Sequence, residues 1–286
     1  MSAAAGLPAA LAARVAAITG RAVRAARPLA GGSVGTVLLL TLDDGSRRVA
    51  KLGPGLEPEA WMLRFLASNT ALPVPALEEG DDDLLLMAHV ETAGGLDAAA
   101  QADAARALAA LHAITAPSYG LERDTVIGGL AQLNTPDPDW VAFYRDRRLG
   151  DMARRAHEAG RLPASLLGRI ERLGARLDQI LDPPARPGLV HGDAWSGNIL
   201  CRAGTVAAFI DPALYFADPE MDLAFGTLFG SFGPAFFEEY HRLRPIRPGF
   251  WEERKDLYLL WPLLVHVRLF GSSYLEPVAR IVARWE

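Results

Sequence analysis

The sequence predicts an α+β fold of two lobes, a small β-rich N-terminal lobe and a larger, mostly helical C-terminal lobe. Alternating apolar runs separated by turn signals fill much of residues 36–90, whereas capped helical patterns dominate from residue 97 onward. No internal repeat or low-complexity linker interrupts the 286 residues, which are enough for two lobes with cores of their own. We therefore expect the lobes to join near residues 88–91, giving domains 1–90 and 91–286.

The N-terminal lobe is expected to be built mainly from strands. The runs "TVLLLTL" and "RRVAKL" flank "DDGS", a turn signal that predicts two neighbouring strands. In "EPEAWMLRFLAS" the apolar residues recur at helical spacing, with Trp61 and Phe65 on one side. The expected elements are a helix at about 7–18, strands at 36–42 and 47–52, a helix at 57–68, and strands at 72–77 and 83–90.

The C-terminal lobe is expected to be helical, with a few short strands. Asp97 is a plausible N-cap for the helix "DAAAQADAARALAALHAI", whose leucines and alanines form an apolar face. Pro262 should kink the last helix that we expect. The expected helices are 97–114, 138–159, 163–181, 219–229, 234–242 and 250–269, and the expected strands are 188–190, 198–202 and 206–211.

Composition excludes several classes of function. The net charge of −5 disfavours nucleic acid as the main ligand. The single cysteine, Cys201, excludes an internal disulfide framework and indicates a reducing compartment. The longest apolar run, at 257–265, is too short to span a bilayer, and the N-terminus lacks the basic region of a signal peptide. We expect a cytoplasmic protein that binds no membrane and no nucleic acid.

Three polar residues lie close together in "HGDAWSGNIL" and the following "DPALY". Asp193 follows a short apolar strand, where its carboxylate could accept or orient a hydroxyl proton. Asn198 and Asp211 offer oxygen ligands suited to Mg²⁺. Turn chemistry would explain any one of them, but it explains poorly why all three follow apolar strands in this order. The set therefore predicts phosphoryl transfer.

The N-terminal lobe offers the remaining parts of a phosphoryl-transfer site. "AGGSVGTVLLL" places Gly31, Gly32 and Gly35 before a strand, where backbone N–H groups can approach phosphate, although an ordinary hairpin turn would look the same. Lys51 is one of only two lysines beside 27 arginines, and it lies on a predicted strand. Glu59 follows in the first turn of a helix and could pair with it; the alternative is a surface ion pair of little energetic weight.

These motifs together resemble a known family. "HGDAWSGNIL" and "DPALYFADPEMDLAF" resemble the aminoglycoside-phosphotransferase and choline-kinase-like group, which has a protein-kinase-like fold. Within that group the chain resembles the fructosamine (ketosamine) kinase family, because several further stretches match it in order. They are "IGGLAQLN", "DWVAFYRDRRLG", "LFGSFGPAFFEEY" and "RPGFWEERKDLYLLWPLLVHVRLFGSSY", and the match covers nearly the whole chain.

The resemblance implies an ATP- and Mg²⁺-dependent kinase with assigned residues. Asp193 would be the catalytic base, and Asn198 and Asp211 would bind Mg²⁺. The hinge "LLMAHV" would offer backbone groups to adenine. The implied nucleotide-binding residues are Gly31, Gly32, Ser33, Gly35, Lys51, Glu59, Met87, Ala88 and Val90.

The acceptor side is less defined by the resemblance. Trp195 is either a wall of the sugar site or a core aromatic residue. Gln132 and Asn134 either line the acceptor side or cap a loop. Glu220, Arg254 and His266 are interpreted as structural polar anchors near the acceptor pocket.

Departures from the family pattern concern regulation and the acceptor. Ser33 stands where many members have a redox-sensitive cysteine, so no disulfide switch is possible there. Ala194 replaces the usual leucine, Ala88 an acidic hinge residue, and Val265 an asparagine close to the acceptor.

We therefore expect phosphorylation of a sugar hydroxyl of a ketosamine, free or protein-bound, by a monomer or weak homodimer. The alternatives are a kinase for an aminoglycoside, choline or a related alcohol, or a catalytically dead nucleotide-binding module.

Overall fold

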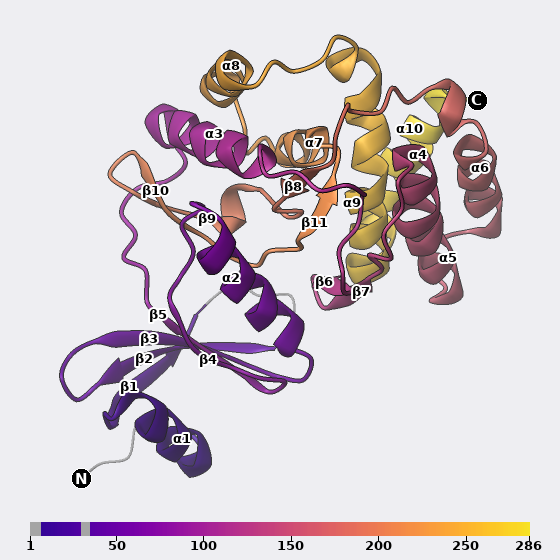
Figure 1. The fold of residues 1–286 in the computed structure, drawn as a ribbon. Helices are drawn as coiled ribbons and strands as arrows, with labels where there is room; N and C mark the ends of the chain where they lie inside the picture. The colour runs from indigo at the N-terminus through magenta and orange to yellow at the C-terminus, as the bar shows by residue number, and fades with distance from the viewer. Residues whose placement is uncertain (1–6, 30–34) are drawn as a thin grey trace.

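The computed structural model describes residues 7–29 and 35–286 and begins with a five-stranded sheet (Figure 1). The strand order is β1-β2-β3-β5-β4, and every neighbouring pair is antiparallel. The elements of this part are α1 (Ala9–Thr19), β1 (Val23–Pro28), β2 (Thr36–Leu42), β3 (Arg47–Leu52), α2 (Glu57–Asn69), β4 (Leu77–Gly80) and β5 (Leu84–Ala88).

The two faces of the sheet are covered by different helices. Side chains alternate between the faces along β5, because a strand has a period of two residues. Leu84 and Leu86 belong to an apolar cluster with Val15 of α1. Leu85 and Met87 belong to another cluster with Ala60 and Leu63 of α2. The predicted strand pattern is therefore that of a central strand buried on both faces.

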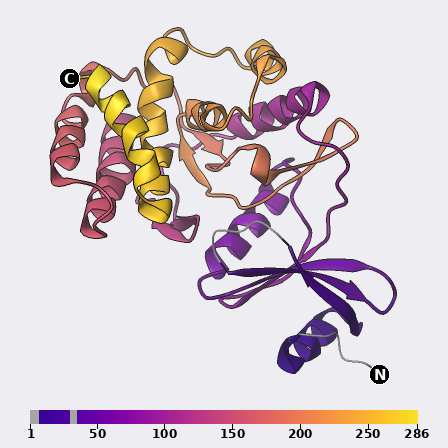
Figure 2. The same ribbon diagram turned by 180° about the vertical axis from the view of Figure 1, so that it is seen from behind.

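The rest of the chain is mostly helical and surrounds one large core (Figures 1 and 2). In this part α3 packs on α8, and α7 packs on α9. Its helices are α3 (Ala98–His112), α4 (Trp140–Phe143), α5 (Asp151–Glu158), α6 (Ala164–Gly174), α7 (Glu220–Leu228), α8 (Pro234–Leu243), α9 (Lys255–Phe270) and α10 (Leu275–Arg284). Three two-stranded ladders join β6 (Thr125–Ile127) to β7 (Leu130–Gln132), β8 (Gly188–Val190) to β11 (Tyr215–Ala217), and β9 (Ile199–Arg202) to β10 (Thr205–Phe209).

Helix α2 is shared between the two cores. Ala60 and Leu63 face the sheet, whereas Met62 and Leu66 join the large core of the helical part. Apolar side chains on two faces are typical of a helix packed between two layers. The position of α2 therefore depends on both parts of the molecule.

One predicted strand is wrong and several elements were not predicted. Residues 72–76 form no strand, and the ladder begins only at Leu77, because Pro73 and Pro75 lack the N–H that a ladder needs. Strands β1, β6, β7 and β11 and helix α10 were not predicted. Helix α9 continues through Pro262. The domain boundary at residue 90 stays a prediction. In the described part of the chain, no helix is long and apolar enough to cross a bilayer.

Candidate active site

A cavity of about 710 Å³ lies between the sheet and the helical part. The sheet contributes apolar side chains and one cation to its wall, among them Val37, Val49, Lys51 and Met87. The helical part contributes polar groups on one side and aromatic groups on another. The lining from that part includes Ile127, Gly128, Asp193, Trp195, Asn198, Asp211, Phe225, Pro262, Val265, His266 and Phe270.

Lys51 extends from β3 into this cavity and is held by two carboxylates. Its Nζ lies 2.7 Å from Glu59 Oε1 on α2 and also contacts Asp211 Oδ1. Burial would lower the pKa of Lys51, but the charges of Asp211 and Glu59 outweigh burial and raise it. Only 12% of the Lys51 side chain is exposed, so this is a desolvated ion pair and differs from a surface pair of little weight. The ammonium therefore remains charged and fixed at the polar side of the cavity.

The loop that carries Asp193 is held by hydrogen bonds from its backbone to the Asp222 carboxylate of α7. Asp222 is fully buried and accepts hydrogen bonds from the N–H groups of His191 (2.7 Å) and Gly192 (2.8 Å). His112 Nε2 lies 3.1 Å from the same carboxylate. Gly192 has φ +82°, and a Cβ there would come within 2.1 Å of the Ala213 carbonyl oxygen. The Asp222 carboxylate and the close Ala213 carbonyl therefore constrain the backbone of this loop.

Asp193 lies in the cavity with its carboxylate oriented by Asn198. Asn198 Nδ2 donates to Asp193 Oδ2 (2.9 Å) and to the Asp193 carbonyl (3.0 Å). Burial, followed by the nearby charge of Asp211, raises the pKa of Asp193 to about 8. A raised pKa makes the ionised carboxylate a stronger base toward a hydroxyl proton, but it also lowers the ionised fraction near neutral pH.

Asn198 and Asp211 have the donor chemistry of a Mg²⁺ site. Asn198 uses its amide N–H group on Asp193, which leaves its carbonyl oxygen as an acceptor. Asp211 has φ +54°, a left-handed conformation that non-glycine residues seldom adopt and that often marks functional sites. Among the described residues no group of three or more His, Cys, Asp or Glu side chains could hold a metal. Two oxygen ligands nevertheless suit Mg²⁺, which commonly completes its coordination with phosphate and water.

The aromatic wall of the cavity consists of Trp195, Phe225, His266 and Phe270. The ring centroids of Trp195 and Phe229 lie 5.3 Å apart, as do those of Phe229 and His266. His266 Nδ1 lies 2.7 Å from the Pro262 carbonyl, so this nitrogen carries the proton and Nε2 is an acceptor. Burial lowers the pKa of His266 and so favours this neutral form. Trp195 lines the cavity and is not a core residue.

The nucleotide-binding residues expected from the sequence lie partly along the same cavity. Met87, Ala88 and Val90 line it, and the Val90 N–H makes no hydrogen bond with another described residue. Gly31, Gly32 and Ser33 lie outside the described residues. Gly35 is described, with φ +81°, and a Cβ there would lie 2.4 Å from the Leu52 carbonyl oxygen.

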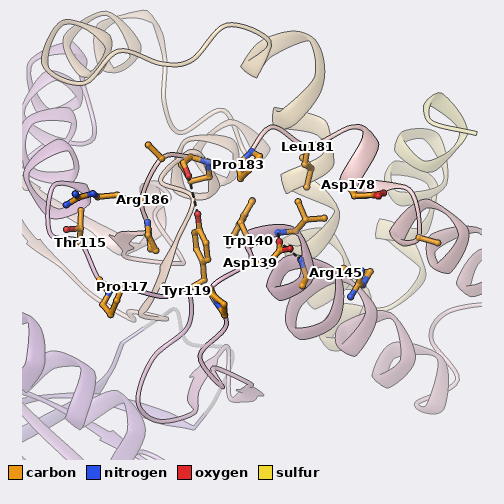
Figure 3. Close-up of a pocket in the computed structure, with 18 residues that line it drawn as sticks. Thr115, Pro117, Tyr119, Asp139, Trp140, Arg145, Asp178, Leu181, Pro183 and Arg186 are labelled. Carbon is orange, nitrogen blue, oxygen red and sulfur yellow. Dashed lines mark hydrogen bonds between the residues drawn. The ribbon is translucent and has the colours of Figure 1, made fainter.

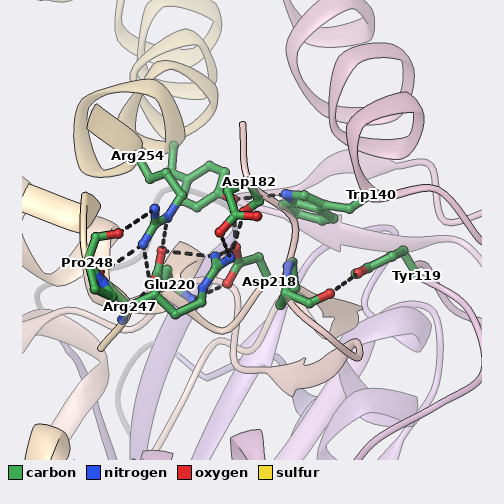
Figure 4. Close-up of polar contacts among 10 residues, drawn as sticks. Tyr119, Trp140, Asp182, Asp218, Glu220, Arg247, Pro248 and Arg254 are labelled. Carbon is green, nitrogen blue, oxygen red and sulfur yellow. Dashed lines mark hydrogen bonds and ion pairs between the residues drawn. The ribbon is translucent and has the colours of Figure 1, made fainter. Parts of the chain in front are cut away.

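Four residues expected near the acceptor do not line the cavity. Gln132 and Asn134 are buried in a hydrogen-bonded network with Thr125 on the hairpin of β6 and β7. Glu220 and Arg254 form a buried bidentate ion pair, with 2.6 Å from Arg254 Nε to Glu220 Oε2 and 3.0 Å from Nη2 to Oε1 (Figure 4). Arg254, directly before α9, is thus joined to Glu220 of α7, and the position of this pair near the acceptor pocket stays a prediction.

Two other polar groups at the site were missed by sequence reasoning. Asp222 lies inside the quoted motif "DPEMDLAF", and its signal was a second carboxylate, after Glu220, in an otherwise apolar helix. His112 closes the predicted helix 97–114, and its partners Asp222 and Tyr240 lie more than 100 residues away in sequence. No local pattern predicts such contacts.

A second cavity, of about 1090 Å³, opens on the helical part (Figure 3). Pro117, Tyr119, Trp140, Pro183 and Arg186 are among its lining residues. None of the residues selected from the sequence lines it. The candidate site is therefore the smaller cavity.

Comparison with known proteins gives consistent matches over nearly the whole chain. The family model described as "Fructosamine kinase" matches residues 12–285. The Arabidopsis thaliana protein named protein-ribulosamine 3-kinase, chloroplastic, is 31% identical over 266 residues, covering 88% of this chain and 79% of the relative. A protein of Enterococcus faecium provisionally named a ketoamine kinase is 34% identical over 229 residues, which is 79% of this chain and 81% of that protein.

Solved structures agree with the fold. A crystal structure from Thermobifida fusca, provisionally named a fructosamine-3-kinase, has 32% identity and a TM-score of 0.84, covering 96% of this chain and 98% of that one. The gentamicin complex of the phosphotransferase APH(2")-IIa has 16% identity and a TM-score of 0.63, covering 98% and 96% of the two chains, and so shares the fold alone. The predicted α+β fold of the kinase-like type is confirmed.

Proposed function

The chain belongs to the fructosamine kinase family, and from this premise we propose that it transfers the γ-phosphoryl group of ATP to a sugar hydroxyl of a ketosamine. The observation that carries the proposal is that Lys51, Asp193, Asn198 and Asp211 converge on one cavity that is also lined by aromatic side chains. Positioning and charge stabilisation are the main requirements of phosphoryl transfer. The polar side of the cavity has the groups to provide both.

In this proposal the nucleotide enters along the sheet. Val37, Val49 and Met87 would contact adenine through apolar side chains, and the Val90 N–H, which bonds no other described residue, would be a hydrogen-bond donor to it. Lys51 holds the phosphates as a compact cation, with Glu59 fixing its direction. Gly35, directly before β2, has a backbone conformation that only glycine adopts without strain, as glycines near bound phosphate often do.

Asn198 and Asp211 are the residues that would hold Mg²⁺, which when bound neutralises charge that develops on the phosphate oxygens. The Lys51 ammonium contacts Asp211. This contact offsets part of the desolvation of the Asp211 carboxylate.

Asp193 would orient the acceptor hydroxyl and take its proton at Oδ1 or Oδ2. Asn198 holds this carboxylate by one hydrogen bond, and Asp222 holds the loop through the backbone of His191 and Gly192. These contacts supply the fixed geometry that general-base catalysis requires.

The aromatic wall is proposed as the site of the ketosamine. A ketosamine carries a secondary ammonium group two carbons from the third-carbon hydroxyl, which is the position that the name of the Arabidopsis relative indicates. The ring face of Trp195, which lines the cavity, would attract such a cation. His266 Nε2, as a neutral acceptor, can receive its N–H. Free sugars without the amine would lack both interactions.

An acceptor screen tests this proposal. ATP consumption would be followed with ribulosyl-lysine and fructosyl-lysine derivatives, with the corresponding free ketoses as matched controls, and with an aminoglycoside and choline. We expect turnover with ketosamines and at least about a tenfold lower kcat/KM with free ketoses, since a hydrogen bond to a charged group contributes about 1.5–3 kcal/mol. Turnover only with the aminoglycoside or choline would replace the proposed acceptor. No turnover with any acceptor, together with no ATP binding, would overturn the kinase assignment.

A further inference from the structure

The Lys51–Glu59 pair joins two elements, and α2, which carries Glu59, is not fixed by the sheet alone. Met62 and Leu66 of α2 enter the core of the helical part. The helix also packs on β6 of the hairpin formed with β7, which lies beside α2 in both ribbon views (Figures 1 and 2). Whatever fixes α2 against the hairpin therefore also influences the distance between Glu59 and Lys51.

Arg123, immediately before this hairpin, contacts two residues of α2. Its Nη2 lies 2.6 Å from Glu57 Oε2, and its Nη1 lies 3.1 Å from Oε1 of the same carboxylate. The guanidinium carbon lies 5.0 Å from the centroid of the Trp61 ring, one helical turn further along. An exposed ion pair alone contributes little, but a bidentate fork that also lies over an aromatic ring fixes geometry as well as charge.

The segment that carries Arg123 is itself rigid. Asn134 Nδ2 donates to the Arg123 carbonyl (3.2 Å) and to Thr125 Oγ1 (2.8 Å), and its backbone N–H donates to Asp124 Oδ1 (2.8 Å). Asn134 in turn accepts from Arg148 Nη2 at 2.6 Å. Asn134 and Arg148 are both fully buried. The backbone around Arg123 is therefore held by hydrogen bonds within the helical part and not by contacts with the sheet.

The same hairpin reaches the active-site cavity and the catalytic loop. Ile127 and Gly128 at its turn line the cavity. Gln132 Nε2 donates to the Ala213 carbonyl (3.1 Å), and the Ala213 N–H donates to the carbonyl of His191 (2.8 Å). The hairpin thus links the Asp193 loop on one side to α2 on the other. This explains the burial of Gln132 and Asn134 away from the cavity.

We propose that Arg123 is a positioning residue that holds α2 from the helical part, so that Glu59 stays on Lys51 and the lysine is preset for the nucleotide phosphates. The proposal rests on the proposed function in one respect, the role of Lys51 toward ATP. Arg123 acts through Glu57 and Trp61 and contacts no reacting atom.

The test is a double-mutant cycle of Arg123→Ala and Glu57→Gln, with Arg64→Ala as the control. Arg64, like Arg123, is an arginine in contact with α2, since it lies on that helix. It donates to the Gly80 carbonyl of the sheet part and not to the hairpin. ADP affinity would be measured by titration calorimetry with and without Mg²⁺, KM would be measured separately for ATP and for the acceptor, and urea unfolding would be followed for every variant.

We expect Arg123→Ala and Glu57→Gln each to weaken ADP binding and raise the KM for ATP about 3- to 30-fold, with the acceptor KM and the unfolding midpoint nearly unchanged. The double variant should bind ADP no more weakly than the weaker-binding single variant, because both substitutions remove the same Arg123–Glu57 contact. Arg64→Ala should bind ADP like the parent chain.

Unchanged ADP affinity in Arg123→Ala and Glu57→Gln, or additive losses in the double variant, would overturn the proposal. So would equal losses for both substrates accompanied by a lower unfolding midpoint, which indicate a purely structural role. If Arg123→Ala does not fold, Glu57→Gln alone decides, since it keeps the size of the side chain. Failure of the parent chain to bind ADP would instead count against the proposed function.

Discussion

The buried carboxylate of Asp222 offers the most quantitative test of how the catalytic loop is held. Asp222→Asn keeps the shape of the side chain but removes the charge and one acceptor. The carboxylate accepts from His191 N–H at 2.7 Å, from Gly192 N–H at 2.8 Å and from His112 Nε2 at 3.1 Å. An asparagine must turn its NH₂ group toward one of these donors and leave it unsatisfied.

An unsatisfied buried donor costs about 1–3 kcal/mol, and the remaining bonds lose their charge assistance, so we expect a loss of about 2–4 kcal/mol in the free energy of unfolding. Because the loop carries Asp193, a shift of the loop should also lower kcat by roughly 10- to 100-fold. The assay is urea denaturation at about pH 7 together with steady-state kinetics on the folded variant.

The pH dependence of the unfolding free energy separates the effect of the Asp222 charge from that of its side-chain shape. Burial would raise the pKa of Asp222, but the hydrogen bond from His112 and the charges nearby outweigh burial and lower it below the ordinary 3.8. A depressed carboxyl pKa stabilises the fold above the unfolded pKa and loses this effect as pH falls through the folded pKa. The stability difference between the parent chain and Asp222→Asn should therefore be constant near neutrality and shrink below about pH 4.

Asp103→Asn is the matched control, since Asp103 also accepts from a backbone N–H, that of Val206 at 2.8 Å, and from Arg106, but its side chain is 30% exposed. It should cost less than about 1 kcal/mol and leave kcat unchanged. A loss below about 1 kcal/mol in Asp222→Asn, with kcat like that of the parent chain, would refute the reasoning.

Three further substitutions have defined outcomes. Gly35→Ala places a Cβ 2.4 Å from the Leu52 carbonyl oxygen at φ +81°, so thermal denaturation should show a loss of roughly 1–3 kcal/mol, and a Tm equal to that of the parent chain would argue against strain. Lys51→Met should lower kcat/KM for ATP about 10²- to 10³-fold with a native circular dichroism spectrum, whereas a loss below about threefold would exclude its role on phosphate. His266→Phe keeps the aromatic packing but removes the Nε2 acceptor. We expect kcat/KM for a ketosamine to fall about 10- to 100-fold while the KM for ATP stays constant. Equal effects on both substrates would contradict a role of His266 in acceptor binding.

Much of the polar side of the site was predictable because its residues lie on strands or next to their ends. Lys51 lies on an alternating strand, Asp193 and Asp211 follow short apolar strands, and Asn198 directly precedes one, so residue type and strand context together indicated one cavity wall. The structure brings all four to that wall. Met87 and Ala88 end the buried strand β5, and Val90 follows it by two residues, so the same strand context applies to them.

The contacts that hold this wall in place were not predictable from local pattern. The hairpin of β6 and β7 has strands of three residues each, too short for a period of two to be recognised. Arg123 and Glu57 are 66 residues apart, and their pairing exists only because α2 packs against that hairpin. Proline explains the error at 72–77, where apolar residues suggested a strand but the missing N–H groups prevent one.

The central claim is that Asp193 activates a ketosamine hydroxyl for attack on ATP. The most direct measurement is ³¹P NMR of the product formed from ATP and ribulosyl-lysine by the parent chain and by Asp193→Asn, with ADP affinity measured on both. We predict a new sugar-phosphate resonance with the parent chain, a rate about 10²- to 10⁴-fold lower with Asp193→Asn, and unchanged ADP binding. Formation of the same product by Asp193→Asn at the parental rate would contradict the account.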